Sequence, residues 1–341
     1  MRAAIVRSTE SIELIDTPTR ALGPHDVRVR VERTGLCGSD IHAYLGTHPF
    51  RKPPMILGHE AAGYVAEVGP EVTRVSVGDL VAIEPQLVCG ACGPCRRGAS
   101  NVCQRKVVLG TTPWPGSLAD ETVVPESVAY PLPATCTPTQ AALVEPLAVG
   151  VHAARVARID LGERVVVIGA GPIGLACAAS ALQAGAGSVL AIDPQPHNLE
   201  LAREAGATSV ASPPEAESAA QGLFGGEGAD VVFIGIGKSV AVQQGLSLLR
   251  KGGGRVVVVA LFDEPITLAD PFQLVGAEAA VLGSQMYRAS DFQTAVDLTV
   301  RGRVDLRSLV SHEIPLANVG DAFRLLVERT GSPVKIHVVA R

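Results

Sequence analysis

The chain has 341 residues, a formal net charge of −5 and a sequence pI of about 5.9. This length suits about two domains, and a composition that is 47% hydrophobic and 18% charged excludes a disordered chain. The acidic balance argues against a nucleic-acid-binding domain, which normally carries a basic patch.

The amino-terminal segment MRAAIVRSTESIEL has no apolar signal core, because Ser8, Thr9 and Glu10 interrupt it. The longest apolar runs are shorter than a membrane span and contain glycines. We therefore expect a cytoplasmic protein that has neither a membrane nor a nucleic acid as a partner.

Residues 1 to about 150 have the pattern of short strands between glycine and proline turns. The segment VRVRVERTG, residues 27–35, alternates β-branched and charged residues, which is typical of a half-buried strand. Strands are also predicted at residues 63–69 and 78–85. Near residue 140 the sequence becomes alanine-rich with helical spacing, and Thr137 or Thr139 could cap that helix.

Residues 88–103, VCGACGPCRRGASNVC, hold four of the seven cysteines in the spacing C-x2-C-x2-C-x7-C. Four thiolates complete a tetrahedral zinc site and leave no open position, so we predict a structural zinc ion there. Its ligands would be Cys89, Cys92, Cys95 and Cys103. The other cysteines, Cys37, Cys136 and Cys177, are dispersed and form no disulfide framework, which favours a reducing compartment.

Residues 164–194 predict a strand, a glycine turn, a helix and a second strand, and this alternation continues to about residue 290. The pattern indicates a doubly wound α/β domain with a parallel sheet covered on both faces. The turn has the form G-x-G-x-x-G, and an acidic residue ends the second strand. The residues that we expect to bind a dinucleotide are Gly169, Gly171, Pro172, Ile173, Gly174 and Asp193.

Each part of this motif has a physical role. The glycines let the backbone approach a pyrophosphate at the positive end of the helix dipole. Asp193 can accept hydrogen bonds from the ribose hydroxyls and repels a 2′-phosphate, so the sequence favours NAD(H) over NADP(H). After residue 290 we predict a helix, a strand, a second helix and a final strand.

A second set of metal-binding residue types occurs earlier in the chain. Cys37 lies in GLCGSDIHAY, and His59 and Glu60 lie in LGHEAAG. Three such ligands with one open position would form a catalytic zinc site. Each residue also has a plain structural explanation: Cys37 could be a small core residue, His59 a turn residue and Glu60 a surface charge.

From Cys37 to Asp193, and in general character over nearly the whole chain, the sequence resembles the zinc-dependent medium-chain alcohol dehydrogenases. The segment GHEAAGYVAEVGPEVTRVSVGDLVA is similar to that family's zinc motif, and the cysteine loop is similar to its structural zinc lobe. The resemblance implies a Rossmann NAD-binding domain at residues 154–290. It also implies a mostly β, GroES-like catalytic domain at residues 1–153 and 291–341, with a catalytic and a structural zinc ion in each subunit.

The resemblance assigns Cys37 and His59 as catalytic zinc ligands. The third ligand stays open between Glu60 and Glu145, because the polyol, threonine and butanediol dehydrogenase branch places either glutamate close to the metal. One thiolate, one neutral imidazole and one carboxylate neutralise Zn²⁺, so we expect one glutamate at a time to bind directly and the other to act through water.

Three further residues near Cys37 match functional positions of the family. Asp40 matches a residue that hydrogen-bonds the ligand histidine. Ser39 and His42 match its proton relay, and Ser39 has a second interpretation as the N-cap of the following helix. The other histidines are expected to be surface or packing residues: His25, His48, His152, His197, His312 and His337.

The implied reaction is the reversible oxidation of a secondary alcohol to a ketone, and a glutamate-type site favours a vicinal diol, polyol or cyclitol. Sorbitol dehydrogenases carry an arginine before a tyrosine, whereas this chain has Met286 before Tyr287. A thioether cannot hydrogen-bond hydroxyls as a guanidinium can, which counts against a long polyol. Trp114, Tyr44 and Phe262 could line a substrate pocket or belong to the core.

Alternative functions stay open at this point. Within the family, the chain could be an L-threonine 3-dehydrogenase-like enzyme or a biosynthetic carbonyl reductase. In another class, it could bind NAD and zinc without catalysis, because a fold does not fix a function. The resemblance implies a homotetramer, with a dimer as the alternative.

Overall fold

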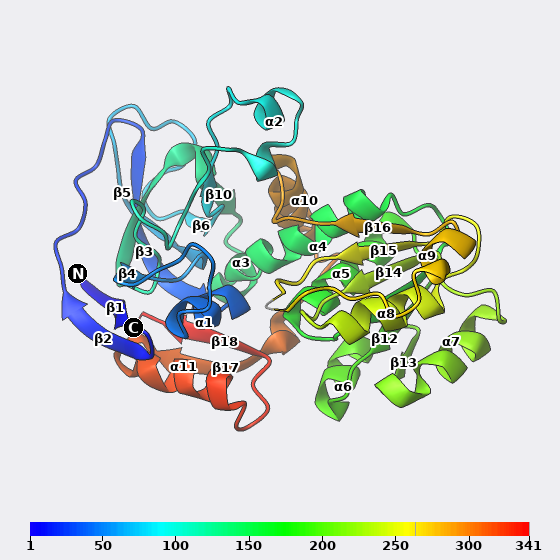
Figure 1. Cartoon of the computed structure of the whole chain (residues 1–341). Coiled ribbons are helices and arrows are strands. Elements are labelled where there is room, and N and C mark those ends of the chain that lie inside the picture. The colour runs from blue at the N-terminus through cyan, green and yellow to red at the C-terminus, as the bar shows by residue number, and fades with distance from the viewer. Residues whose placement is uncertain (263, 341) are drawn as a thin grey trace. The chain divides into compact units, whose positions relative to one another are not determined.

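The computed structural model describes residues 1–262 and 264–340, and the chain forms two compact units (Figure 1). One unit consists of Met1–Glu145 and Arg288–Arg341, and the other of Pro146–Tyr287. The first predicted boundary, after residue 153, falls inside helix α4 (Val144–Ala157). The structure divides the chain near the start of this helix because Ala153 and Ala157 pack in the core of the second unit.

The first unit is built mainly from β-sheets. A seven-stranded sheet has the order β10-β6-β5-β3-β18-β17, with β9 also paired to β3; a second sheet has the order β2-β1-β4, and β7 pairs with β8. The strands are β1 (Arg2–Ser8), β2 (Ser11–Asp16), β3 (Asp26–Gly35), β4 (Met55–Ile56), β5 (Glu60–Val68), β6 (Leu80–Ile83), β7 (Gln86–Leu87), β8 (Val107–Val108), β9 (Glu121–Pro125), β10 (Ala129–Leu132), β17 (Val310–Pro315) and β18 (Lys335–Val339).

Helices complete this unit. The predicted cap at Thr137 is confirmed, because its hydroxyl accepts a hydrogen bond from the Gln140 N–H. The amino-terminal hairpin of β1 and β2 was not predicted. The helices are α1 (Gly38–Tyr44), α2 (Gly93–Arg96), α3 (Pro138–Ala142), the start of α4, α10 (Ala289–Val300) and α11 (Val319–Glu328).

The second unit is the predicted doubly wound domain. All strand pairs of its six-stranded sheet are parallel, in the order β13-β12-β11-β14-β15-β16. Its elements are β11 (Arg164–Ile168), α5 (Pro172–Ala184), β12 (Ser188–Ile192), α6 (Pro196–Glu204), β13 (Ser209–Ala211), α7 (Ala216–Phe224), β14 (Val231–Ile234), α8 (Ser239–Leu248), β15 (Arg255–Val258), α9 (Phe272–Gly276) and β16 (Ala280–Gly283).

Alternate residues of the central strands face two separate cores. Val166 and Ile168 of β11 pack with α7 and α8, whereas Val165 and Val167 pack with α4 and α5. Because side chains of a strand point alternately to opposite faces, an all-apolar strand such as RVVVI requires cover on both sides. Among residues 1–262 and 264–340, no helix combines the length and apolar character that crossing a bilayer requires.

Candidate zinc centres and dinucleotide site

Cys37 is the N-cap residue of α1. Its backbone N–H donates a hydrogen bond to Oδ2 of Asp40 at 3.1 Å, which fixes the start of the helix. Ser39 is therefore not the N-cap, and that interpretation of it was wrong. Ser39 and His42 are three residues apart on α1 and so share a face of the helix, and Nδ1 of His42 lies 3.0 Å from Oγ1 of Thr47.

His59 and Glu60 lie where the chain enters β5. The preceding Gly58 has a φ of +95°, and a Cβ there would meet Thr34 Cγ2 at 2.8 Å, so the turn requires glycine. Gly35 of β3 pairs with Glu60, and a Cβ at residue 35 would overlap the Glu60 carboxylate. The glycine opposite Glu60 thus makes room for a buried acid.

Cys37, His59 and Glu60 form one cluster, in which one ligand atom of each lies within 4.8 Å of the others. A thiolate, an imidazole and a carboxylate suit a catalytic zinc ion, so the donor set fits the predicted metal. Glu145 is buried in the first turn of α4 but is not a member of this cluster. The structure therefore brings together three of the four predicted ligands.

Lys335 is a buried partner of Glu60 that the sequence did not reveal. Its Nζ lies 2.7 Å and 2.8 Å from the two carboxylate oxygens of Glu60, and it also donates to the carbonyl oxygen of Leu36 at 3.1 Å. Burial alone would lower the pKa of this amine, but the negative charges of Glu60, Cys37 and Glu145 raise it. A lysine in the apolar strand KIHVV was the available sequence signal.

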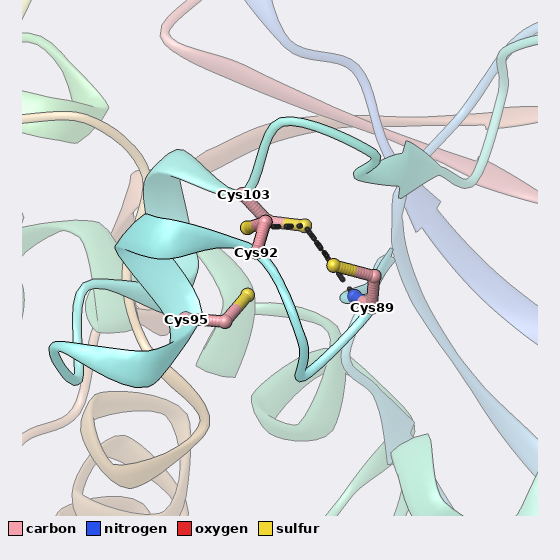
Figure 2. A group of neighbouring side chains, drawn as sticks. All are labelled: Cys89, Cys92, Cys95 and Cys103. Atoms are coloured by element: carbon pink, nitrogen blue, oxygen red, sulfur yellow. Dashed lines mark hydrogen bonds between the residues drawn. The ribbon is translucent and has the colours of Figure 1, made fainter.

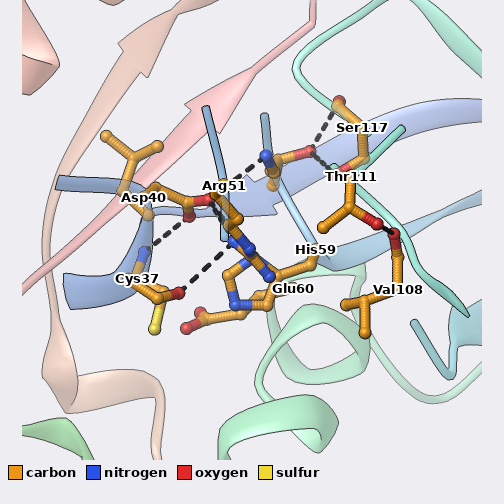
Figure 3. Close-up of polar contacts among 12 residues, drawn as sticks. Cys37, Asp40, Arg51, His59, Glu60, Val108, Thr111 and Ser117 are labelled. Carbon is orange, nitrogen blue, oxygen red and sulfur yellow. Dashed lines mark hydrogen bonds and ion pairs between the residues drawn. The ribbon is translucent and has the colours of Figure 1, made fainter. Parts of the chain in front are cut away.

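Asp40 lies behind His59, as the resemblance implied. Its Oδ1 is 3.3 Å from Nδ1 of His59 and 3.1 Å from Nη1 of Arg51 (Figure 3). Burial would raise the pKa of the Asp40 carboxyl, but the charges of His59 and Arg51 hold it well below its ordinary value. Asp40 is therefore a buried anion that orients the imidazole, and Arg51 is a second contact that no sequence motif indicated.

The four cysteines of residues 88–103 converge on one point (Figure 2). Their sulfur atoms all lie within 4.8 Å of one another, with Cys103 Sγ 3.5 Å from Cys89 Sγ. Backbone N–H groups of Ala91 and Cys92 lower the pKa of the Cys89 thiol to about 5, which favours the thiolate that zinc requires. This donor set fits a closed structural zinc site.

The glycine turn of the second unit has the geometry of a phosphate-binding loop. Gly169 has a φ of +91°, Gly171 is the N-cap of α5, and Pro172 begins that helix. A Cβ at Gly174 would overlap the carbonyl oxygen of Gly169, so this glycine allows close packing of helix on strand. Ile173, the remaining predicted residue, packs against the core that includes α5. The loop fits a dinucleotide pyrophosphate.

Asp193 follows β12 and is tied to the glycine turn. Its Oδ2 accepts the N–H of Ala170 at 2.8 Å, and its Oδ1 accepts the Gln195 N–H at 2.8 Å and the Asn198 Nδ2 at 3.1 Å. These bonds fix the carboxylate at the carboxyl end of the strand, where a ribose binds in such sheets.

The three candidate pocket aromatics lie in apolar packing. Trp114 belongs to the core of the first unit, and its indole N–H donates to the Val123 carbonyl at 3.3 Å. Tyr44 packs on Phe323 with ring centroids 4.9 Å apart. Phe262 packs against a core cluster of the second unit. The structure supports the core role for Trp114, whereas Tyr44 and Phe262 are only half-buried and pack at the margins of the cores.

Comparison with known proteins gives family matches for both units. The profile of the alcohol dehydrogenase GroES-like domain matches residues 23–134, and that of the zinc-binding dehydrogenases matches residues 172–301. The chain is also 37% identical over 334 residues to a probable D-xylulose reductase A of Aspergillus clavatus, covering 94% of this chain and 92% of the relative.

Solved structures agree in fold over almost the full length. A putative zinc-binding dehydrogenase of Sinorhizobium meliloti bound to NADP matches with a TM-score of 0.91 and 30% identity, covering 99% of this chain and 98% of the other. The 2R,3R-butanediol dehydrogenase of Bacillus subtilis matches with a TM-score of 0.89 and 29% identity, covering 100% of this chain and 99% of the other.

Proposed function

The chain belongs to the zinc-dependent medium-chain alcohol dehydrogenases, and we propose that it oxidises a secondary alcohol that carries a neighbouring hydroxyl. The observation that carries this proposal is the cluster of Cys37, His59 and Glu60, in which His59 and Glu60 are buried and Cys37 is half-buried. The printed activities of two relatives, on D-xylulose and on 2R,3R-butanediol, support a vicinal diol, polyol or cyclitol as substrate.

Glu60 is the favoured third ligand, because it is a member of the 4.8 Å cluster and Glu145 is not. Glu145 then acts through water. The charges around such a site would balance. The positive groups would be Zn²⁺ and the buried side chains of Arg51 and Lys335. The negative groups would be the Cys37 thiolate and the carboxylates of Asp40, Glu60 and Glu145. A neutral centre of this kind lowers the cost of burying so many charges.

The reaction converts a secondary alcohol and NAD⁺ into a ketone, NADH and a proton, with the hydride leaving the alcohol carbon. A zinc ion held by Cys37, His59 and Glu60 would supply Lewis acidity at the alcohol oxygen, and NAD⁺ bound at the glycine turn would supply the hydride acceptor. Ser39 accepts the alcohol proton as its own hydroxyl hydrogen passes on toward His42, which releases a proton to solvent. Their positions on one face of α1 support this order.

NAD(H) is the proposed cofactor. Asp193 presents a carboxylate at the end of β12, and the next residues, PQPHN, contain no lysine or arginine to bind a 2′-phosphate. The Sinorhizobium meliloti relative was solved with NADP. The preference is therefore a property to be measured for this chain, with both cofactors in every assay.

NADH formation by the zinc-loaded protein tests the substrate proposal. The panel contains 2,3-butanediol, sorbitol, xylitol, myo-inositol, an aminocyclitol and threonine, and Cys136→Ser serves as the cysteine control for Cys37→Ser. We expect turnover of a diol, polyol or cyclitol that Cys37→Ser abolishes and Cys136→Ser retains.

Turnover of threonine alone would favour the threonine dehydrogenase alternative, and a blank panel with reduction of a ketone by NADH would favour the carbonyl reductase. Tight NADH binding without any turnover would contradict an enzymatic function.

A homotetramer in the cytoplasm is the proposed setting, with a dimer as the alternative. The edge strand β16 carries Val281, which is 41% exposed, and the nearby α9 carries Phe272 and Val275, each 73% exposed. An exposed apolar sheet edge supports a contact between copies. Light scattering should show a smaller assembly for Val281→Lys than for the parent chain, and an unchanged mass would contradict this interface. Cell fractionation tests the location.

A further inference from the structure

Arg51 has a buried guanidinium on the loop between α1 and β4, and only 5% of the residue is exposed. Its backbone N–H donates to Nδ1 of His48 at 3.1 Å, which fixes the turn that carries the side chain. The adjacent Lys52 is exposed and donates to the carbonyl oxygen of Gly46. One cation of this pair thus faces solvent, and the other is buried beside the zinc-ligand cluster.

The Arg51 guanidinium contacts three side chains through one nitrogen atom. Nη1 lies 3.1 Å from Oδ1 of Asp40, 3.3 Å from Nδ1 of His59 and 3.4 Å from Oγ of Ser39. Figure 3 shows Arg51 beside Asp40 and His59, with Cys37 close by. Arg51 therefore joins the residue behind the zinc ligand to the first residue of the proposed proton relay.

The tautomer of His59 decides which of these contacts are hydrogen bonds. An anionic Asp40 at 3.3 Å accepts a hydrogen from Nδ1, which leaves Nε2 as the zinc-binding atom. Arginine is a donor only, so it cannot hydrogen-bond a nitrogen that already carries hydrogen. With His59 in this tautomer, the partners of Arg51 are Asp40 and Ser39.

The contact between Arg51 and Ser39 fixes the orientation of the Ser39 hydroxyl. A serine oxygen has two acceptor positions and one donor hydrogen. If Arg51 fills one acceptor position, the other is free for the substrate hydroxyl, and the serine hydrogen must point elsewhere. Proton transfer along the relay then has one orientation rather than several, and a cation stabilises negative charge that develops on the oxygen.

We propose that Arg51 is a positioning residue, which holds Asp40 and through it His59, and which orients the Ser39 hydroxyl. This inference rests on the proposed function for the relay, but the His59 part concerns the zinc site alone. It predicts that loss of the guanidinium changes the geometry of the metal as well as the rate.

The test compares Arg51→Met and Arg51→Lys with Arg324→Met, which removes an exposed guanidinium of α11. Visible absorption of the cobalt(II)-substituted proteins reports metal geometry, and subtraction of the Cys37→Ser spectrum isolates the catalytic site. Kinetics with NAD⁺ and the best alcohol give kcat and KM separately, and NADH fluorescence confirms cofactor binding.

We expect Arg51→Met to alter the cobalt spectrum and to lower kcat about 10- to 100-fold, with a smaller change in KM. Arg51→Lys should restore part of both, because an ammonium keeps the charge but cannot reach Asp40 and Ser39 in the same planar geometry. Arg51→Lys combined with Ser39→Ala should cost less than the sum of the two single losses, since one of the two actions of Arg51 is on the Ser39 hydroxyl; the part that acts through Asp40 should remain.

The inference would be overturned if both Arg51 variants had the same cobalt spectrum and the same kcat as Arg324→Met. Its relay part would be overturned if the losses in kcat from Arg51→Lys and Ser39→Ala were fully additive. If Arg51→Met does not fold, Arg51→Lys decides by the same comparison. A parent chain without turnover contradicts the proposed function instead, and the cobalt spectra still test the contact with the His59 site.

Discussion

The ammonium group of Lys335 lies 2.7 Å and 2.8 Å from the two carboxylate oxygens of Glu60, and both side chains are buried. The pair joins the last strand of the first unit to the start of β5, in the sheet where both β18 and β5 pair with β3. It places a fixed positive charge beside a proposed zinc ligand. A second buried acid, Glu145, is close enough for its negative charge to raise the pKa of the same ammonium group.

Removing one partner of this pair should be more harmful than removing both. Lys335→Met leaves the Glu60 carboxylate without its cation, and breaking a buried pair costs about 3–5 kcal/mol of unfolding free energy. Glu60→Gln combined with Lys335→Met should recover part of that loss. Urea unfolding of the two single variants and the double variant gives the coupling energy, with the exposed Lys52→Met as the lysine control. Additive losses would show that the two side chains do not stabilise one another.

The structural zinc site should be separable from the catalytic one. Cys95→Ser removes one of four thiolates from a closed site, so we expect lower thermal stability and one zinc fewer per subunit by elemental analysis. Turnover at low temperature should persist. Cys37→Ser should instead abolish turnover while folding and NADH binding remain. An unchanged melting curve and an undiminished zinc content in Cys95→Ser would refute the structural assignment.

The features that the sequence predicts well are local. The cysteine loop and the glycine turn place their functional residues within a few positions of one another, so spacing alone describes the geometry. The apolar strand RVVVI likewise predicts its own burial on two faces. In these elements, residues that are close in the sequence are also close in space, so the sequence is enough to predict the local structure.

The features that the sequence did not predict depend on distant contacts. Glu60 and Lys335 are 275 positions apart, and only the pairing of β5 and β18 with β3 brings them together. Within the predicted alternation, helix α7 has a weak sequence signal of its own, because its segment AESAAQGLF is rich in small and polar residues, and its buried residues pack against the sheet. The hairpin β1–β2 was missed because its polar turn also interrupts the apolar pattern.

The cofactor preference should depend on the charge at Asp193 rather than on its neighbours. Asp193→Gly removes the ribose acceptor and also the bonds to Ala170 and Gln195, so we expect KM for NAD⁺ to rise about 10- to 100-fold. The ratio of kcat/KM for NADP⁺ to that for NAD⁺ should increase, because no carboxylate repels the 2′-phosphate. Asn198→Ala is the matched control, since it removes a partner of the carboxylate but leaves its charge. An unaltered cofactor ratio in Asp193→Gly would contradict the assignment.

His48 should make the fold sensitive to mild acid. Its Nδ1 accepts backbone hydrogen bonds from Phe50 and Arg51. Burial, together with the positive charges of Arg51 and His42, lowers the pKa of the imidazole to about 4. In the unfolded chain a histidine has a pKa of about 6.5, so between pH 6.5 and pH 4 the unfolded state binds more protons than the folded state.

Unfolding free energy should therefore fall as the pH decreases through that window, by roughly 3 kcal/mol from this residue, and level off below it. His48→Asn keeps an acceptor near the position of Nδ1 but has no titrating group, so its stability should lack this component. Urea unfolding of both proteins at intervals from pH 7 to pH 4, with equal zinc loading, isolates the difference. Parallel pH curves for the parent chain and His48→Asn would show that His48 does not remain neutral in the fold.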